Sequence, residues 1–317
     1  PSRLQIADLK LQIDTIYENY KVAQNPEITL EANPDDLSEE YLIELSKIGI
    51  NRLSIGIQSF FEDDLAMMNR AHNSVEAQKC LELATQYFDN ISIDLIYGIP
   101  GMSDEQWQQN IETALRFGVP HISSYALTVE PKTALNTLIQ KGKIEAPKDE
   151  VAEAHFQILV ETLEKNGFIH YELSNFGKEN YFSKNNSAYW LGKKYIGIGP
   201  SAHSYDGISR SWNVANNALY LKAIQQNQLP NEKEILSTAD RYNEYIMTGL
   251  RTIWGVALDR IEREFGLDYL DYLIKQSEKF VKDELLAIEN NILKPTSKGK
   301  FLTDGIASDL FYINSEV

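Results

Sequence analysis

Carboxylate and amide side chains occur inside apolar stretches of the first half of the chain, where they could hold a polar ligand. We predict β-strands at four such stretches: 27–33, 52–58, 91–97 and 121–129. Since successive residues of a strand point to opposite faces, Glu31, Gln58 and Asp94 lie on polar faces, as does Ala126 beside Ser124 and Thr128. Buried carboxylates are rare unless they are paired or bound to something. The pattern predicts a shared polar interior with a ligand site; an ordinary core with a few satisfied polar groups is the plainer alternative.

The sequence between and after these strands has helical periodicity. In the first half, helices are expected at 4–20, 38–48, 62–88 and 104–117. Strands that alternate with helices predict a parallel sheet, open or closed into a barrel. Further helices are expected at 149–165, 238–250, 258–265 and 268–289, and a hairpin follows the last of them. Three helices and a hairpin are typical of a winged-helix module, so we divide the chain into domains 1–214 and 215–317.

Charge and cysteine content exclude several classes of protein. The net charge is −16 over 317 residues, and a nucleic-acid binder normally carries a basic face. No apolar run approaches the length of a membrane helix, and no signal peptide is recognisable. Cys80 is the only cysteine, so a disulfide framework is impossible and a cytoplasmic setting is expected.

The middle of the chain has a different composition. Residues 168–213 are rich in Asn, Ser, Gly, Tyr and Trp, and NYFSKNNSAYWLGKKYIGIGPSAHSYDG contains six aromatic side chains punctuated by glycines. Flat apolar side chains of this kind can line a pocket for a planar ligand. An aromatic mini-core that closes the end of a barrel fits the composition equally well.

Several motifs resemble those of one family. EITLEANP, NRLSIGIQSF, the arginine of MMNRAH and IDLIYGIPG resemble the core of coproporphyrinogen-oxidase-like radical S-adenosylmethionine (SAM) proteins. YELSNF, NNSAYW and GIGPSAHS are similar to the HemW-type heme chaperones of this family rather than to its coproporphyrinogen dehydrogenases. The resemblance runs over nearly the whole chain. It implies an α/β fold: a partial parallel (β/α) barrel of the radical SAM type, followed by a C-terminal helical winged-helix-like domain.

The resemblance also implies which residues contact SAM. A carboxylate at Glu31 would accept bonds from a ribose or an ammonium group, and Gln58 offers both a donor and an acceptor. The guanidinium of Arg70 would pair with the methionyl carboxylate. Asp94 would bond ribose hydroxyls, and Ala126 would allow close approach of the backbone.

The cluster that this family uses has no ligands in the chain. Family members carry a CxxxCxxC loop for a [4Fe–4S] cluster, and then a GGGTPS loop. The chain begins at Pro1-Ser2, which is similar to the end of that second loop. We therefore expect a shortened chain without the first strands, either designed in this form or produced by proteolysis. Cys80 is no substitute because it lies with Ala77 and Leu81 on the apolar face of a helix. No metal ligand is assigned.

The motif that the family associates with heme departs from its pattern. HNxxYW reads NNSAYW here, so Asn185 replaces the expected histidine, and a carboxamide is a poor iron ligand. The heme contacts implied by the resemblance are Asn185, Asn186, Tyr189, Trp190 and His203. His203 and His170 are alternative axial ligands, although a lone histidine is more often a core residue. Lys184, Lys193 and Lys194 could pair with the propionates, or simply be solvated.

The resemblance implies a heme chaperone that binds heme, and SAM with a [4Fe–4S] cluster in the intact protein. It would pass heme to a membrane-bound or cytochrome acceptor; no catalytic residue is assigned, and a homodimer is left open. The alternative is an oxygen-independent coproporphyrinogen III oxidase of porphyrin biosynthesis. NNSAYW with GIGPSAHS favours the chaperone. An unrelated α/β-barrel enzyme for a sugar or phosphate would bind neither heme nor SAM.

Overall fold

A computed structural model describes residues 1–313 of the chain. It divides into two compact units, Pro1–Phe182 and Ser183–Val317. The division falls inside the aromatic-rich segment, and the domain boundary at 214/215 stays a prediction. No helix among the described residues is long and apolar enough to cross a membrane.

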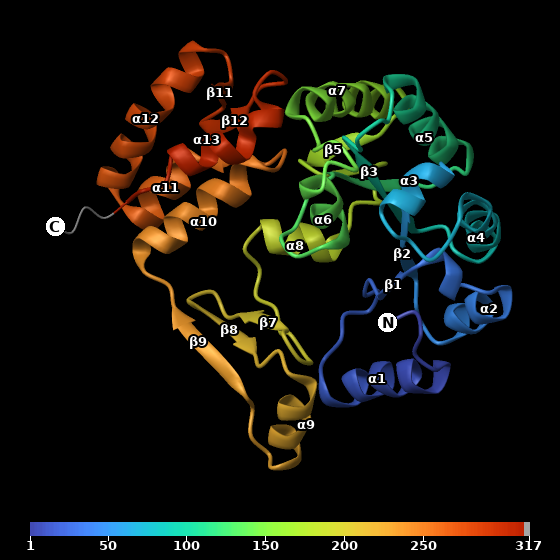
Figure 1. Ribbon diagram of the computed structural model, residues 1–317. Coiled ribbons are helices and arrows are strands. Elements are labelled where there is room, and N and C mark those ends of the chain that lie inside the picture. The colour runs from blue at the N-terminus through green and yellow to red at the C-terminus, as the bar shows by residue number, and fades with distance from the viewer. Residues whose placement is uncertain (314–317) are drawn as a thin grey trace. The chain divides into compact units, whose positions relative to one another are not determined.

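The first unit alternates strands and helices, as expected (Figure 1). Its elements are α1 (Ile6–Asn19), β1 (Thr29–Ala32), α2 (Glu39–Lys47), β2 (Arg52–Gln58), α3 (Glu62–Met67), α4 (Ser74–Tyr87), β3 (Ile91–Tyr97), α5 (Asp104–Arg116), β4 (His121–Ala126), α6 (Ala134–Gln140), α7 (Asp149–Lys165), β5 (Ile169–Glu172) and β6 (Asn175–Gly177). The region predicted as one helix at 62–88 is two helices, because Asn69 between them adopts a positive φ of 54°.

The six strands form one sheet in the order β1-β2-β3-β4-β6-β5. Strands β1 to β4 are mutually parallel, which confirms the α/β expectation, and β1 forms an edge. The hairpin of β5 and β6 was not foreseen; β6 runs antiparallel to β4. Among the described residues, β1 and β5 are the two ends of the strand order, and no pairing between them is observed.

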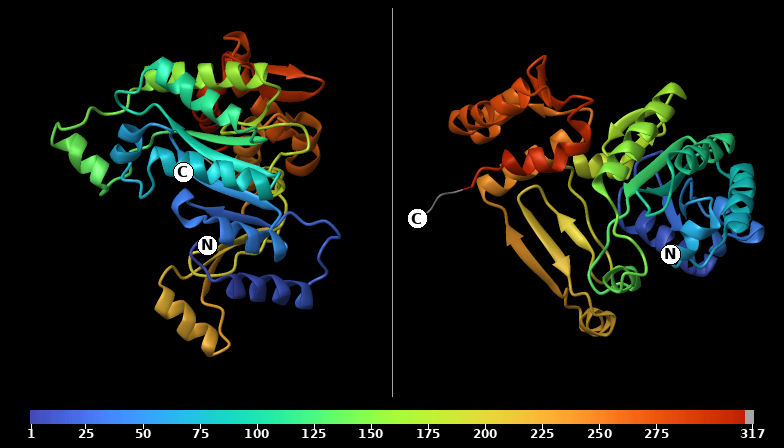
Figure 2. Two further views of the ribbon diagram at one scale, coloured as in Figure 1. Left: turned by 90° about the vertical axis from the view of Figure 1, so that its right-hand side faces the viewer. Right: turned by 45° about the horizontal axis from the view of Figure 1, so that its top comes forward.

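Apolar side chains hold helices against one face of this sheet. Leu53, Ile55 and Ile57 of β2 are fully buried, and Figures 1 and 2 show helices α2, α4, α5 and α7 along the outer side of the sheet. Leu45 of α2 and Ile111 of α5 are fully buried as well. Burial of this face contributes roughly 25 cal/mol for each Å² of apolar surface removed from water. The opposite face is left for the polar side chains.

The register corrects one expectation about the fourth strand. Asp94 of β3 pairs with Ser123 of β4, so His121, Ser123 and Tyr125 share its face. Ala126 lies on the other face, contrary to the prediction that grouped it with Asp94. A shift of one residue in the assumed alternation exchanges the two faces of a strand.

The second unit contains two small antiparallel sheets and several helices (Figure 1). Its elements are α8 (Lys184–Trp190), β7 (His203–Tyr205), β8 (Ser209–Asn213), α9 (Asn217–Gln225), β9 (Asn231–Ile235), α10 (Thr238–Leu250), β10 (Val256–Ala257), α11 (Leu258–Phe265), α12 (Leu267–Lys282), β11 (Leu286–Glu289), β12 (Ile292–Pro295) and α13 (Thr303–Asp309). The helix predicted at 268–289 ends at Lys282 because the chain then turns into β11.

Helices α10, α11 and α12 with the sheet β10-β12-β11 have the arrangement of a winged helix. Tyr242, Ile246, Ile261, Leu273 and Leu293 are fully buried in its core. Gly255 makes the turn into β10 with a φ of +67°, where an added Cβ would lie 2.8 Å from the carbonyl oxygen of Leu293. Glycine is therefore required at this turn both by its conformation and by the space available.

The substitution Gly255→Ala should destabilise the second unit by about 2–4 kcal/mol, from left-handed strain and overpacking together. Gly192→Ala is the control: it lies in the same unit and has a similar φ of +65°, but nothing lies within 4 Å of the added methyl group. Chemical denaturation measures both free energies of unfolding. Equal losses in the two variants would contradict the packing argument.

Candidate functional site

Four of the five residues predicted to contact a cofactor line one hollow of about 390 Å³ in the first unit. Glu31 comes from β1, Gln58 from the end of β2, Asp94 from β3 and Arg70 from the loop between α3 and α4. The rest of the lining comes from the N-terminal segment and from the ends of β1 and β2: Pro1, Ser2, Arg3, Ala32, Asn33, Asp36, Ser54 and Gly56. Ala126 does not line this hollow, which agrees with its position on the other face of β4.

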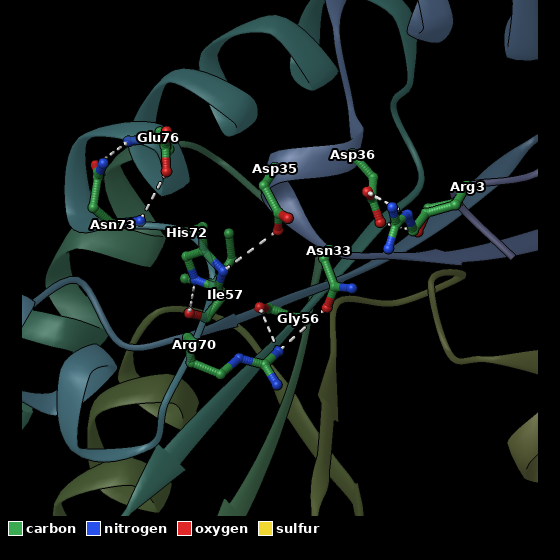
Figure 3. Close-up of polar contacts among 11 residues, drawn as sticks. Arg3, Asn33, Asp35, Asp36, Gly56, Ile57, Arg70, His72, Asn73 and Glu76 are labelled. Carbon is green, nitrogen blue, oxygen red and sulfur yellow. Dashed lines mark hydrogen bonds and ion pairs between the residues drawn. The ribbon is translucent and has the colours of Figure 1, made fainter.

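Arg70 reaches over the ends of two strands. Its Nη2 atom lies 3.3 Å from the carbonyl oxygen of Gly56 and 3.4 Å from Oδ1 of Asn33 (Figure 3). An arginine held through one nitrogen keeps other donors for a carboxylate ligand. This position satisfies the geometric requirement of the predicted role.

His72 anchors the loop that carries Arg70. The buried imidazole contacts the carbonyl oxygen of Ile57 through Nε2 at 3.0 Å, and its Nδ1 lies 3.9 Å from Oδ1 of Asp35 (Figure 3). Burial lowers the pKa of His72, so the neutral ring donates through Nε2. The loop is thus attached to β2 at a point two residues from Arg70.

Gly56 makes room for the two side chains that face the ligand space. An added Cβ at this position would lie 2.9 Å from Nε2 of Gln58 and 3.0 Å from Nη2 of Arg70. Gln58 itself has a φ of +68°, where the register between β2 and β3 shifts. The strand therefore ends in an irregular segment that directs Gln58 toward the hollow.

Asp94 is the buried carboxyl group of the site. Burial raises its pKa to about 6, and the nearby charge of Glu31 acts in the same direction. A hydrogen bond with Ser123 and the charges of Arg52 and Arg70 act in the opposite direction. Arg52 is itself buried and 4% exposed, so a cation lies within the polar interior beside the acids. The hollow can therefore hold a ligand that offers both hydroxyl groups and positive charge.

A hydrogen-bonded network that the sequence reasoning missed lies on the same face as Asp94. Ser92 Oγ lies 2.7 Å from Nδ1 of His121, and Nε2 of that ring lies 2.7 Å from the Tyr171 hydroxyl. Burial lowers the pKa of His121 to about 3, so the ring is neutral and bridges a donor and an acceptor. The alternation His121, Ser123, Tyr125 was the signal that could have revealed this network.

The YELSNF motif supplies the other half of this network. Ser123 Oγ donates to Oδ1 of Asn175 at 2.9 Å, and Nδ2 of Asn175 donates to Glu172 at 2.5 Å. Glu172 also accepts the backbone N–H of Ser174 at 3.0 Å. These residues satisfy the buried polar groups beneath the hollow rather than lining it.

The second unit gathers aromatic side chains around one face of the sheet β7-β8-β9. Tyr195 bridges to Tyr205 of β7, and the ring of Tyr189 on α8 meets Tyr195 edge-on at 4.5 Å. His203 pairs with Trp212 of β8, and their rings are 6.2 Å apart. His203 lies two residues from Tyr205 and therefore on the same face. It is exposed, so it is not a core residue.

The remaining predicted heme contacts lie on α8. Ser183 caps this short helix by accepting the N–H of Asn186 at 3.2 Å, and Asn185 is exposed in the first turn. Trp190 ends the helix, and the guanidinium of Arg251 lies over its ring at 5.0 Å. His170 belongs to the first unit, where it is buried and stacks on Phe176 at 4.1 Å. That position is typical of a core histidine.

Comparison with known proteins decides the family. Residues 5–114 match the Radical SAM superfamily, and residues 236–302 match the HemN C-terminal domain. The chain is 35% identical to the heme chaperone HemW of Bacillus subtilis, covering 95% of this chain and 80% of that protein. It is 32% identical to HemW of Lactococcus lactis, covering 96% and 83%. The chain belongs to the HemW family.

The solved structure of Escherichia coli coproporphyrinogen III oxidase (HemN), a radical SAM enzyme, shares the fold of this HemW-family chain. The TM-score is 0.82 at 21% identity, over 98% of this chain and 75% of the other. This likeness concerns the fold alone. Both the resemblance read from the motifs and the expected radical SAM fold with a C-terminal helical domain are confirmed.

Membership of the radical SAM superfamily implies SAM and a [4Fe–4S] cluster, and the two groups fit this chain differently. The hollow offers the donors and acceptors that SAM requires. The chain offers no set of thiolate ligands for the cluster, because Cys80 is its one cysteine. Cys80 is buried in α4, and burial raises the pKa of its thiol to about 12. No group of three His, Cys, Asp or Glu residues within 1–313 could hold a metal ion.

The raised pKa of Asp94 predicts a pH-dependent cost of folding. In the folded chain the Asp94 carboxyl group stays protonated up to about pH 6, whereas the ordinary pKa of an aspartate is 3.8. The free energy of unfolding therefore falls as the pH rises between these two values. Asp94→Asn should remove this loss and stabilise the first unit by about 1–3 kcal/mol at pH 7. Urea denaturation at pH 4 and pH 7 measures the effect, with the exposed Asp89→Asn as control. The same pH dependence in Asp94→Asn and the unmodified chain would refute the assignment.

Proposed function

We propose that this HemW-family chain is a heme chaperone that binds SAM in the hollow of the first unit and heme on the second unit. The SAM part of the proposal is supported by one observation: four residues from separate elements, Glu31, Gln58, Arg70 and Asp94, line the same hollow. The sequence motifs by themselves predict the same four residues.

Each residue of the hollow has a distinct role in this proposal. Arg70 pairs with the carboxylate of the methionyl group, because its guanidinium is held over the ends of β1 and β2. Asp94 accepts hydrogen bonds from ribose hydroxyls when ionised, and Glu31 interacts with the ammonium group or a ribose hydroxyl. Gln58 provides one donor and one acceptor. A role for Ala126 stays a prediction.

In the cluster-bearing protein, Arg70→Ala and Asp94→Ala should each weaken SAM binding about ten- to hundredfold, since each removes a charge-assisted hydrogen bond. Isothermal calorimetry at pH 7.5, where Asp94 is mostly ionised, measures the affinities. Arg116→Ala is the control, because Arg116 lies on α5 and its Nη2 is bonded to Thr113 rather than directed to the hollow. Unchanged SAM affinity in Arg70→Ala would exclude the proposed pairing.

The heme part of the proposal rests on the aromatic face of the second unit. A porphyrin is flat and apolar, and aromatic rings offer contacts of the same kind. Tyr189, Tyr195, Tyr205 and Trp212 lie around this face, and Trp190 is on the adjoining helix. The protein named HemW in Bacillus subtilis is described as a heme chaperone, and we extend that description to this chain.

We assign the axial ligand to His203. It is an exposed imidazole on the aromatic face, whereas position 185, which the family motif gives to histidine, holds an asparagine. Imidazole is a common ligand of heme iron. Lys184 begins α8, Lys193 and Lys194 follow it, and all three are exposed; we assign the propionates to this group of cations.

Hemin titration followed by the Soret band tests this surface. Trp190→Ala should weaken binding more than Asn185→Ala, because the indole contributes apolar contact area and the amide does not. His203→Ala should shift the Soret maximum if the ligand is lost. The absence of a saturable Soret change, or loss of binding in Asn185→Ala with none in Trp190→Ala, would show that the proposed surface is wrong.

The proposal places the chain among chaperones rather than oxidases. The HemW proteins of Bacillus subtilis and Mycobacterium tuberculosis are 35% and 31% identical to this chain, whereas the likeness to HemN is one of fold. We also propose that the chain works in the cytoplasm and passes heme to an acceptor protein. A homodimer stays a prediction.

A further inference from the structure

Arg251 joins three parts of the second unit. It caps the C-terminal end of α10, and its Nη1 atom donates to both carboxylate oxygens of Asp304 on α13, at 2.6 and 2.7 Å. The same guanidinium lies over the ring of Trp190 at 5.0 Å. One side chain therefore contacts the helix of the NNSAYW motif and two helices of the C-terminal domain.

The ion pair is favourable without the tryptophan. Arg251 lies at the negative end of the α10 dipole, and Asp304 lies in the first turn of α13, at the positive end of that helix. The side chain of Arg251 is only 17% exposed, so the pair is partly shielded from solvent. The guanidinium is thus fixed at its edge, and its planar face remains for the indole.

We propose that Arg251 is the positioning residue that orients Trp190 for heme, and that Asp304 holds Arg251 in place. The guanidinium covers one face of the indole, which fixes the ring plane and leaves its other face for the porphyrin. This inference rests on the proposed function, because it specifies how the proposed heme surface is built. It extends that surface into the C-terminal domain.

Hemin affinity in a double-mutant cycle tests the proposal. Without Arg251 the indole must be ordered when hemin binds, at a cost no larger than that of the lost cation–π contact, so Arg251→Ala should weaken hemin binding about two- to tenfold. Because Arg251 acts through the indole, Arg251→Ala combined with Trp190→Ala should bind no more weakly than Trp190→Ala alone. Arg251→Lys keeps a cation near the ring and should recover part of the affinity.

Arg260→Ala is the matched control. Arg260 lies over the ring of Tyr245 at 4.0 Å and pairs with Glu264 at 3.0 Å. The substitution therefore removes a cation–π contact and an ion pair of the same kinds elsewhere in the unit. It should leave hemin affinity unchanged. Should Arg251→Ala unfold the unit, Asp304→Asn and Arg251→Lys supply the same comparison with the charge of the arginine retained.

The outcomes separate this inference from the proposed function. The positioning role is overturned if Arg251→Ala binds hemin with wild-type affinity. It is also overturned if the double variant loses hemin affinity by the product of the two single factors. In both cases, a weakened affinity in Trp190→Ala still supports the heme surface. If Trp190→Ala binds hemin as the unmodified chain does, both the surface and the positioning role are wrong.

Discussion

The inner face of the parallel sheet imposes the main constraint on the first unit, because each polar group buried there needs a partner. Ser92, His121 and Tyr171 form one chain of contacts at 2.7 Å, and Ser123, Asn175 and Glu172 form another. An unpaired buried polar group costs about 1–3 kcal/mol. The hairpin of β5 and β6 supplies these partners: Tyr171 for His121, and Asn175 for Ser123. The hollow with Glu31 and Asp94 lies on the same face, where the buried Arg52 keeps an Nε atom without a hydrogen-bond partner.

The second unit depends on different forces. Ring contacts among Tyr189, Tyr195 and Tyr205 link α8 with the sheet β7-β8-β9. A second group of rings surrounds Tyr242 in the winged-helix core, formed by Phe265, Tyr269 and Tyr312. The rings of the first group are half-buried or exposed, whereas Tyr242 is fully buried. Rings of the first group can exchange contacts with one another for contacts with a flat ligand at little cost in folding free energy.

Much of this architecture could be predicted from the sequence. The strands at 52–58 and 91–97 match β2 and β3, because their apolar alternation is strong. The motif residues Glu31, Gln58, Arg70 and Asp94 were assigned from resemblance, and the fold brings them together. The fourth strand was assigned to the wrong face, since HISSYALTV permits either phase of alternation and only the pairing of Asp94 with Ser123 selects one. The roles of Arg52 and Tyr171 depend on partners far away in sequence, which periodicity does not reveal.

The span of chain between those partners has a consequence for how the protein folds. His121 and Tyr171 are 50 residues apart, and Ser123 and Asn175 are 52 apart. The strands β1 to β4 can pair in sequence order as each crossover helix forms, but the β5–β6 hairpin must return across α6 and α7. Closing that long loop carries an entropic cost that local pairings do not. The floor of the hollow should therefore be among the last parts to assemble, so that binding capacity appears only when the whole sheet is complete.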